Sequence, residues 1–258
     1  MIINHNMNAI NAHRNMTNNT NASGKSMEKL SSGLRINRAG DDAAGLSISE
    51  KMRGQIRGLD QAARNSQDGI SYIQTAEGAL TEVSAMLTRM KELAVQKANG
   101  TNNTQDTANI DLEMNTLKDE VKNITDNTKF NGKNVFTSTN VAITVTQDAA
   151  GLLNIGAATL TKTIALGSGS TVGQIEAAID EVNLQRATYG SQQNRLEHTI
   201  NNLNTTSENL TAAESRIRDV DMAKEMMNFS KNNILQQAAQ AMISQANQQP
   251  QGVLQLLR

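Results

Sequence analysis

The feature that most constrains the fold is a regular stripe of apolar residues between Ile175 and Ile217. Alternate steps of four and three residues pass through thirteen positions, nine of which are apolar or aromatic. A period of 3.5 residues sustained over about six heptads is typical of a helix in a coiled coil. Such a helix would be roughly 65 Å long at ~1.5 Å per residue, so it needs partner helices alongside. The thirteen positions are Ile175, Ile179, Val182, Arg186, Tyr189, Gln193, Leu196, Ile200, Leu203, Ser207, Leu210, Glu214 and Ile217.

Two further segments supply the partners. Residues 59–99 are predicted to form a second long amphipathic helix, and residues 105–128 a third one. Gly100–Asn103 reads as a stop and a turn, and so short a connection makes the third helix antiparallel to the second. The apolar seam of the second helix comprises Ile73, Ala76, Leu80, Val83, Leu87, Met90 and Ala94, and that of the third comprises Ile110, Met114, Leu117, Val121 and Ile124.

Residues 33–58 are rich in glycine and charge. They predict a loop or bent connection followed by a helix start, with Asp41 or Asp42 as the N-cap. The basic side chains have two interpretations, a phosphate-binding patch or interhelical and intersubunit ion pairs, of which the ion pairs are favoured. The basic residues are Arg35, Arg38, Lys51, Arg53 and Arg57, and the expected acidic partners are Asp41, Asp42, Glu50 and Asp60.

The character of the chain changes between residues 129 and 172. Phe130–Lys133 reads as a turn, and Val141–Thr146 alternates as a strand does, with Thr163–Leu166 as its candidate partner. Residues 167–171 form a loop, after which the helix begins at about Thr171. We therefore expect a small β-hairpin or sheet that caps one end of the helices.

Both chain ends carry thin apolar stripes. Residues 1–32 bury too little surface alone to offset a backbone ordering cost of ~1–2 kcal/mol per residue, so we expect disorder until something covers them. Residues 222–248 are equally sparse, and Pro250 is expected to end their helix. The two ends can cover one another in part, and further copies of the chain would cover the rest. Contacts between unlike patches can grow into an open helical filament.

Catalytic and ligand-binding interpretations find little support. The chain has no cysteine and a formal net charge of -1, and its histidines, at positions 5, 13 and 198, are far apart. Gly167-x-Gly169 continues to Val172, so the dinucleotide fingerprint fails. Residues 130–180 are too short for an embedded catalytic domain. We expect no enzyme activity, no cofactor or metal, and no nucleic-acid or membrane partner. The N-terminus lacks the pattern of a cleaved signal peptide.

Two sets of motifs resemble those of bacterial flagellin. Near the N-terminus they are Met27–Asn37, Gly40–Gly45, Asp68–Ser71 and Thr75–Leu80, and near the C-terminus Ala213–Ala223 and Gln245–Pro250. The resemblance is collinear and covers about 1–136 and 183–258. Many flagellins carry large outer domains in the middle, where this chain has only residues 130–180. The resemblance is thus to a short form that lacks large outer domains.

The resemblance implies a mainly α fold and a structural function. The fold would be a long antiparallel helical bundle with a small β-hairpin region, and the terminal helices would form a separate inner coiled coil on assembly. Residues 1–42 and 219–258 would be the two halves of the inner filament domain. Residues 43–218 would be the outer helical domain, with its β region at about 130–172. The chain would polymerise into the filament used for motility. The alternative is a hook–filament junction protein or another export substrate of the same architecture.

Partners and surfaces are also implied. The family would pair this chain with itself, an export chaperone, the flagellar type III export apparatus, hook-associated and cap proteins, and a host innate immune receptor, and would place it outside the cell in the flagellum. The receptor-recognition residues implied by resemblance are Arg89, Lys91, Glu92, Leu93, Gln96 and Glu113. The residues expected to serve self-assembly in the filament core are Ile3, Met7, Ile10, Leu30, Met226, Phe229, Leu235, Met242, Leu254 and Leu257.

Overall fold

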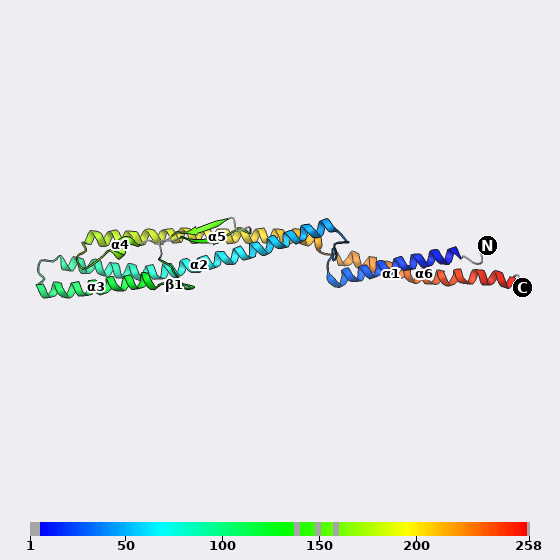
Figure 1. Ribbon diagram of the computed structural model, residues 1–258, viewed down its shortest axis with the longest axis horizontal. Coiled ribbons are helices and arrows are strands. Elements are labelled where there is room, and N and C mark those ends of the chain that lie inside the picture. The colour runs from blue at the N-terminus through cyan, green and yellow to red at the C-terminus, as the bar shows by residue number, and fades with distance from the viewer. Residues whose placement is uncertain (1–5, 137–139, 148–150, 157–159, 257–258) are drawn as a thin grey trace. The chain divides into compact units, whose positions relative to one another are not determined.

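The computed structural model describes residues 6–136, 140–147, 151–156 and 160–256. The chain divides into two compact units, each of which is described by itself (Figure 1). The first unit combines Met1–Gly54 with Asn209–Arg258, and the second spans Gln55–Glu208. The long helices are α1 Met7–Ser32, α2 Ala43–Lys97, α3 Thr104–Asn127, α5 Val172–Arg218 and α6 Met222–Leu256. The expected mainly α fold class is confirmed.

The second unit is built on the predicted seams of α2, α3 and α5. Every seam position of α2 between Ile73 and Ala94 is buried, and all thirteen stripe positions of α5 are buried or half-buried. The α5 helix is continuous through Gly190. In Figure 1, α3 lies beside α2. Arg89 pairs with Glu113 whereas the later Lys97 pairs with the earlier Asp111, so the two helices are antiparallel, as predicted.

The structure confirms the helix start predicted after Asp41 or Asp42, but this start belongs to the same helix as residues 59–97. The helix begins at Ala43, not near residue 59, and its glycine-rich first turns are regular helix. Asp42 caps it, because its Oδ1 accepts the Gly45 N–H at 2.9 Å. A Cβ on Gly45 would lie 2.7 Å from the Cδ1 of Ile36. This glycine therefore marks a close approach of two segments and does not break the helix.

Two small hairpins follow α3. Strands β1 (Lys129–Phe130) and β2 (Lys133–Asn134) are antiparallel and joined by the predicted turn, where Asn131 has a φ of 49° and Gly132 a φ of 77°. Positive φ at both central residues is the type I′ turn that suits a two-residue hairpin. Strand β3 (Val141–Thr144) pairs antiparallel with β4 (Leu152–Ile155).

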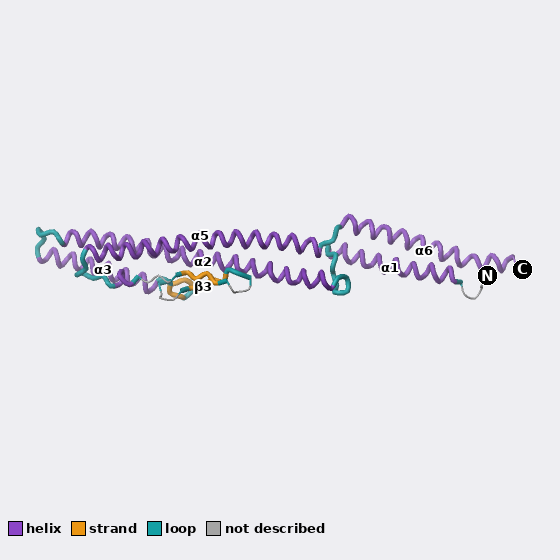
Figure 2. Tube along the Cα trace, turned by 90° about the horizontal axis from the view of Figure 1, so that it is seen from above, coloured by secondary structure: helices purple, strands orange, loops and turns teal. Residues whose placement is uncertain are grey.

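The expected partner strand and the expected position of the β region are both wrong. Thr163 and Ile164 of the candidate strand belong to a short helix, α4 (Thr161–Ile164), and the backbone N–H of Thr163 donates to the carboxylate of Glu181. The true partner of β3 is β4, which buries Leu153 and Ile155 and exposes Leu152 and Asn154. Figure 2 shows β3 alongside the long helices. The hairpin lies against their sides because Gly69 of α2 leaves room for Ile143.

In the first unit, α1 and α6 lie side by side (Figures 1 and 2). Gly33, with a φ of 71°, ends α1, and its N–H donates to the Lys29 carbonyl at 2.9 Å. The α6 helix continues through Pro250 to Leu256, so the prediction that Pro250 ends it is wrong. A proline removes only one helical donor. Disorder of residues 1–32 without a covering partner stays a prediction.

Candidate functional site

The packing between α1 and α6 relies on small and polar side chains. Among the described residues of this pair, Ser26 and Ala246 are the ones that are buried. Side chains form two hydrogen bonds between the helices. Ser23 Oγ lies 3.1 Å from Asn233 Oδ1, and Asn6 Nδ2 donates to the Ala246 carbonyl at 2.7 Å. Since position 6 pairs with 246 and position 23 with 233, the helices run antiparallel.

The large apolar side chains of the pair point outward. Nine of them are exposed, by 41% to 67% of their surface. Single exposed apolar residues are ordinary, but a concentration of this kind on two helices marks an interaction surface. Burying one such side chain completely is worth roughly 1.5–3 kcal/mol. We call these nine residues the outer apolar set: Met7, Ile10, Met27, Met222, Met226, Met227, Ile234, Leu235 and Met242.

Half of the ten residues expected to serve self-assembly belong to this set. Those that the structure exposes are Met7, Ile10, Met226, Leu235 and Met242, whereas Leu30 and Phe229 are half-buried. Ile3 and Leu257 lie outside the described residues. Leu254 lies within α6, in the part whose side chains are not described. Sequence reasoning missed Met227 and Ile234, because each breaks the single stripe that was traced along α6.

A groove runs between the two helices on one side of the pair. It has a volume of about 450 Å³ and is lined by amide and small side chains together with one methionine. None of the described residues that line it is charged. A groove lined by amide and alanine side chains can accommodate an uncharged side chain from another chain. The lining residues are Asn8, Asn11, Ala12, Asn15, Ala239, Met242, Gln245 and Ala246.

A clasp, defined as residues 33–42 and 217–221, joins the two connections of the first unit. Leu34 and Asp219 form an isolated antiparallel β-bridge. Backbone hydrogen bonds of 2.6 and 3.0 Å flank the bridge, and the guanidinium of Arg35 donates to a carbonyl on the opposite side. The clasp thus ties the segment before α2 to the segment after α5.

Ion pairs reinforce the clasp. Arg218 Nη1 lies 2.7 Å from Glu50 Oε1, and Arg53 lies 3.2 Å from the same oxygen. The hydrogen bond from Arg218 lowers the pKa of Glu50 below its ordinary value. Arg38 pairs with Glu28 at 2.8 Å, a partner that the sequence did not indicate. For Arg38 and Arg53, the structure supports the ion-pair interpretation over a phosphate patch.

Two of the expected acidic partners act on the backbone. Asp41 Oδ2 accepts the N–H groups of Asn37 and Arg38 at 3.1 and 3.0 Å. The hydrogen bond from Arg38 is the main reason that the pKa of Asp41 is lowered. Asp42 caps α2. Both aspartates therefore shape the turn into α2 and do not form the ion pairs expected of them.

The second unit carries most of the residues implied for receptor recognition on one face of α2 and α3. Arg89 bridges Glu113 at 2.9 Å and Glu92 at 3.1 Å, and all three are exposed, as is Gln96. The pKa of Arg89 is raised, chiefly by the hydrogen bond that its guanidinium donates to Glu113. We call these four residues the charged face.

Two of the implied recognition residues do not share the charged face. Leu93 is only 2% exposed and belongs to the core of the second unit, so its placement in a contact surface is wrong. Helical spacing turns position 93 toward the seam that includes Met90 and Ala94. Lys91 is half-buried and pairs with Glu176 of α5 at 2.9 Å. It therefore faces a different helix from Arg89.

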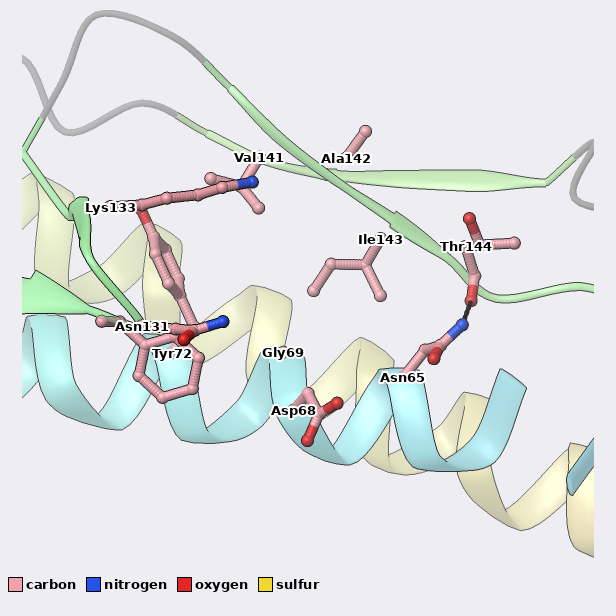
Figure 3. Close-up of a pocket in the computed structure, with 11 residues that line it drawn as sticks. Asn65, Asp68, Gly69, Tyr72, Asn131, Lys133, Val141, Ala142, Ile143 and Thr144 are labelled. Carbon is pink, nitrogen blue, oxygen red and sulfur yellow. Dashed lines mark hydrogen bonds between the residues drawn. The ribbon is translucent and has the colours of Figure 1, made fainter. Parts of the chain in front are cut away.

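An open cleft of about 300 Å³ lies where β3 crosses α2. In Figure 3, Ile143 points down toward Gly69, and Asn65 donates to the Thr144 carbonyl at 3.3 Å. The ring of Tyr72 packs edge-on against Phe130, with centroids 5.8 Å apart. The sequence analysis did not identify this cleft. Its polar groups hold the hairpin on α2.

Metal sites and membrane spans are two further features that the described part of the chain could contain. Within it, no three His, Cys, Asp or Glu side chains are grouped so that they could hold a metal ion. No helix in the same part combines the length and hydropathy required of a membrane span. The surfaces of the two units are therefore the candidate functional features of the described chain.

Comparison with known proteins agrees with this architecture. A family model described as the bacterial flagellin N-terminal helical region matches residues 3–141, and one described as the C-terminal helical region matches residues 172–257. The chain is 56% identical over 275 residues to the flagellin of Halalkalibacterium halodurans, and the match covers 100% of both chains. It is 51% identical over 306 residues to the flagellin of Bacillus subtilis, again over 100% of both.

Among solved structures, the crystal structure of Bacillus cereus flagellin matches 58% of this chain and 94% of that chain. The sequence identity is 34% and the TM-score is 0.49.

Proposed function

This chain belongs to the bacterial flagellin family and is a structural subunit of the flagellar filament, and from that premise we propose that it polymerises through the outer apolar set of α1 and α6. The single observation that carries the proposal is the inverted packing of this pair. Small and polar side chains lie between the helices, and the large apolar ones face away. Neighbouring copies would bury the outer apolar set and so stabilise the polymer.

The proposal also assigns the parts of the chain to an inner and an outer domain. Residues 1–42 and 219–258 form the inner filament domain, and residues 43–218 form the outer helical domain. The packing of α1 on α6 supports the first grouping. The deep core shared by α2, α3 and α5 supports the second, because that core needs no other copy.

Family membership supports a set of further partners. The subunit leaves the cell through the flagellar type III export apparatus, with a chaperone bound before export. In the filament it contacts hook-associated and cap proteins. Thin apolar stripes at both ends suit this route, because segments that order only on assembly pass an export channel unfolded.

The charged face of the second unit is proposed as the contact for a host innate immune receptor. Its support is the exposure of Arg89, Glu92, Gln96 and Glu113 together on α2 and α3. Leu93 is excluded from this contact, since its side chain is buried.

The test of polymerisation uses the full chain and one pair of substitutions. Met227→Ser combined with Ile234→Ser removes two side chains that are 67% and 65% exposed. We expect the critical concentration for assembly, measured by sedimentation and electron microscopy, to rise about tenfold or more, since each 1.4 kcal/mol lost is about a factor of ten.

The matched control is Leu112→Ser, which polarises a side chain that is 71% exposed on α3, in the other unit. We expect its critical concentration to stay within about twofold of the parent value. An unchanged critical concentration for the double substitution would refute the proposed surface. Failure of the parent chain to polymerise under any salt condition would refute polymerisation itself.

A further inference from the structure

Pro250 leaves one backbone carbonyl of α6 without its usual partner. In an α-helix the carbonyl of residue 246 accepts the N–H of residue 250, and proline has no N–H. The α6 helix nevertheless continues to Leu256. Ala246 is only 8% exposed, so its carbonyl has little access to solvent. A buried carbonyl without a donor costs roughly 1–3 kcal/mol, so this one requires another donor.

The donor comes from the start of α1. Asn6 Nδ2 lies 2.7 Å from the Ala246 oxygen. The other atom of the same amide is also engaged, because Asn6 Oδ1 accepts the Ala9 N–H at 3.2 Å and caps α1. One short side chain thus caps its own helix and completes the hydrogen bonding of the other. Aspartate, serine and threonine can all cap, but aspartate offers no donor, and a hydroxyl offers a single proton.

The clasp aligns α1 and α6 at one end of the pair, but toward the other end little else fixes how far along one another the helices lie. Small side chains at the interface, such as Ala12 and Ala239, provide no large knobs that would make a shifted alignment costly. The other side-chain hydrogen bond between the described residues of the two helices, from Ser23 to Asn233, joins polar groups that are half-buried. By contrast, the Ala246 carbonyl is unique along α6, because it lies four residues before the only proline of the chain.

We propose that Asn6 and Pro250 set the register of α1 on α6 at the end of the pair away from the clasp. Pro250 creates a single acceptor on α6, and Asn6 recognises it from the N-cap of α1. The inference rests on the proposed function, since register matters when the outer apolar set must match the surface of another copy. A slide of one helix would shift Met7 and Ile10 relative to the exposed apolar residues of α6, such as Met242, and spoil that match.

The test is a double-mutant cycle on the critical concentration for assembly of the full chain. Asn6→Asp keeps the oxygen that caps α1 but removes the donor and sets a second acceptor against the carbonyl. We expect it to raise the critical concentration about five- to tenfold. Pro250→Ala restores an N–H that satisfies the carbonyl within α6. In that background, Asn6→Asp should change the critical concentration by less than about twofold.

Asn18→Asp is the control for added charge, since it makes the same change on α1 at an exposed position that does not line the groove. It should leave the critical concentration within about twofold of the parent. An equal effect of Asn6→Asp with Pro250 and with Ala at position 250 would overturn the register proposal. So would an Asn6→Asp chain that assembles like the parent. Either result leaves the proposed function intact, whereas a parent chain that does not assemble contradicts the proposed function and not the register.

Discussion

At the scale of single residues, Gly69 shows how the hairpin of the second unit is positioned. A Cβ at this position would lie 2.2 Å from the Cδ1 of Ile143 and 3.3 Å from the Cδ1 of Leu196. Ile143 is itself buried, so it has little freedom to move. The close approach of β3 to α2 therefore depends on the missing side chain.

Gly69→Ala is predicted to destabilise the second unit by about 1–2 kcal/mol. Overpacking costs roughly 1–3 kcal/mol, of which the better helix propensity of alanine offsets about 0.5–1. Gly78→Ala in the same helix meets nothing within 4 Å and should stabilise by about 0.5–1 kcal/mol. Chemical denaturation measures the free energy of unfolding of both variants. A change of the same sign in both would contradict the prediction.

Tyr189 carries a buried hydroxyl group in the core of the second unit. Its side chain is fully buried, and its hydroxyl has no hydrogen-bond partner in the described structure. Burial raises the pKa of Tyr189 to about 12 from an ordinary value of 10.0. The folded state therefore favours the neutral form. This group contributes stability that is complete below pH 10 and is lost as the pH rises toward 12, because the unfolded chain ionises first.

Tyr189→Phe is predicted to leave stability at pH 7 unchanged or to raise it by about 1 kcal/mol, since no hydrogen bond is lost. Above pH 10 the variant should lose less stability than the parent. Tyr72→Phe is the matched comparison, because the Tyr72 hydroxyl donates to the Val135 carbonyl at 3.1 Å. That variant should lose about 1 kcal/mol at pH 7. Urea denaturation at pH 7 and pH 10.5 measures both, and a larger loss at pH 7 for Tyr189→Phe would contradict the account.

At the scale of elements, long periodic helices were the part that the sequence predicted well. The α5 stripe and the seams of α2 and α3 repeat for many turns, so a single misplaced residue does not obscure them. The β4 strand has only four residues between Gly151 and Gly156, which is too short for its alternation to stand out. The Ala246 carbonyl, four residues before Pro250, receives its donor from Asn6, more than two hundred residues away, and local pattern cannot supply such a partner.

The candidate surfaces were predictable in composition but not in orientation. Sequence identified most of the outer apolar set and the charged run on α2. It could not tell that small residues would face inward on α1 and α6, since a thin stripe leaves the inward face undetermined. The misplacement of Leu93 has the same origin, because a residue inside a recognised motif was assigned to the surface without its helical phase.

A pair of leucines tests the faces of α2 and α3. Leu93→Ala should destabilise the second unit by about 2–5 kcal/mol, as truncation of a core leucine does. Leu112→Ala, at a position that is 71% exposed, should cost less than about 0.5 kcal/mol. Thermal unfolding of the full chain measures both. Comparable losses in the two variants would show that Leu93 does not belong to the core.

At the scale of the whole molecule, the two units differ in what stabilises them. The second unit has a continuous core that runs through α2, α3, α5 and the hairpins. In the first unit, the α1–α6 pair instead buries small side chains, relies on the clasp and on hydrogen bonds between the two helices, and exposes nine large apolar residues. The second unit thus has a core of its own, whereas we propose that other copies of the chain complete the first.

The central claim is that neighbouring copies bury the outer apolar set, and methionine oxidation tests it without any substitution. Met7, Met27, Met226, Met227 and Met242 are exposed in the single chain. Dilute peroxide should oxidise these methionines rapidly in dissociated subunits, and at least about tenfold more slowly in polymer, as followed by mass spectrometry. The fully buried Met90 and Met114 provide internal controls and should react slowly in both states. Equal oxidation rates of the exposed methionines in subunit and polymer would contradict the account.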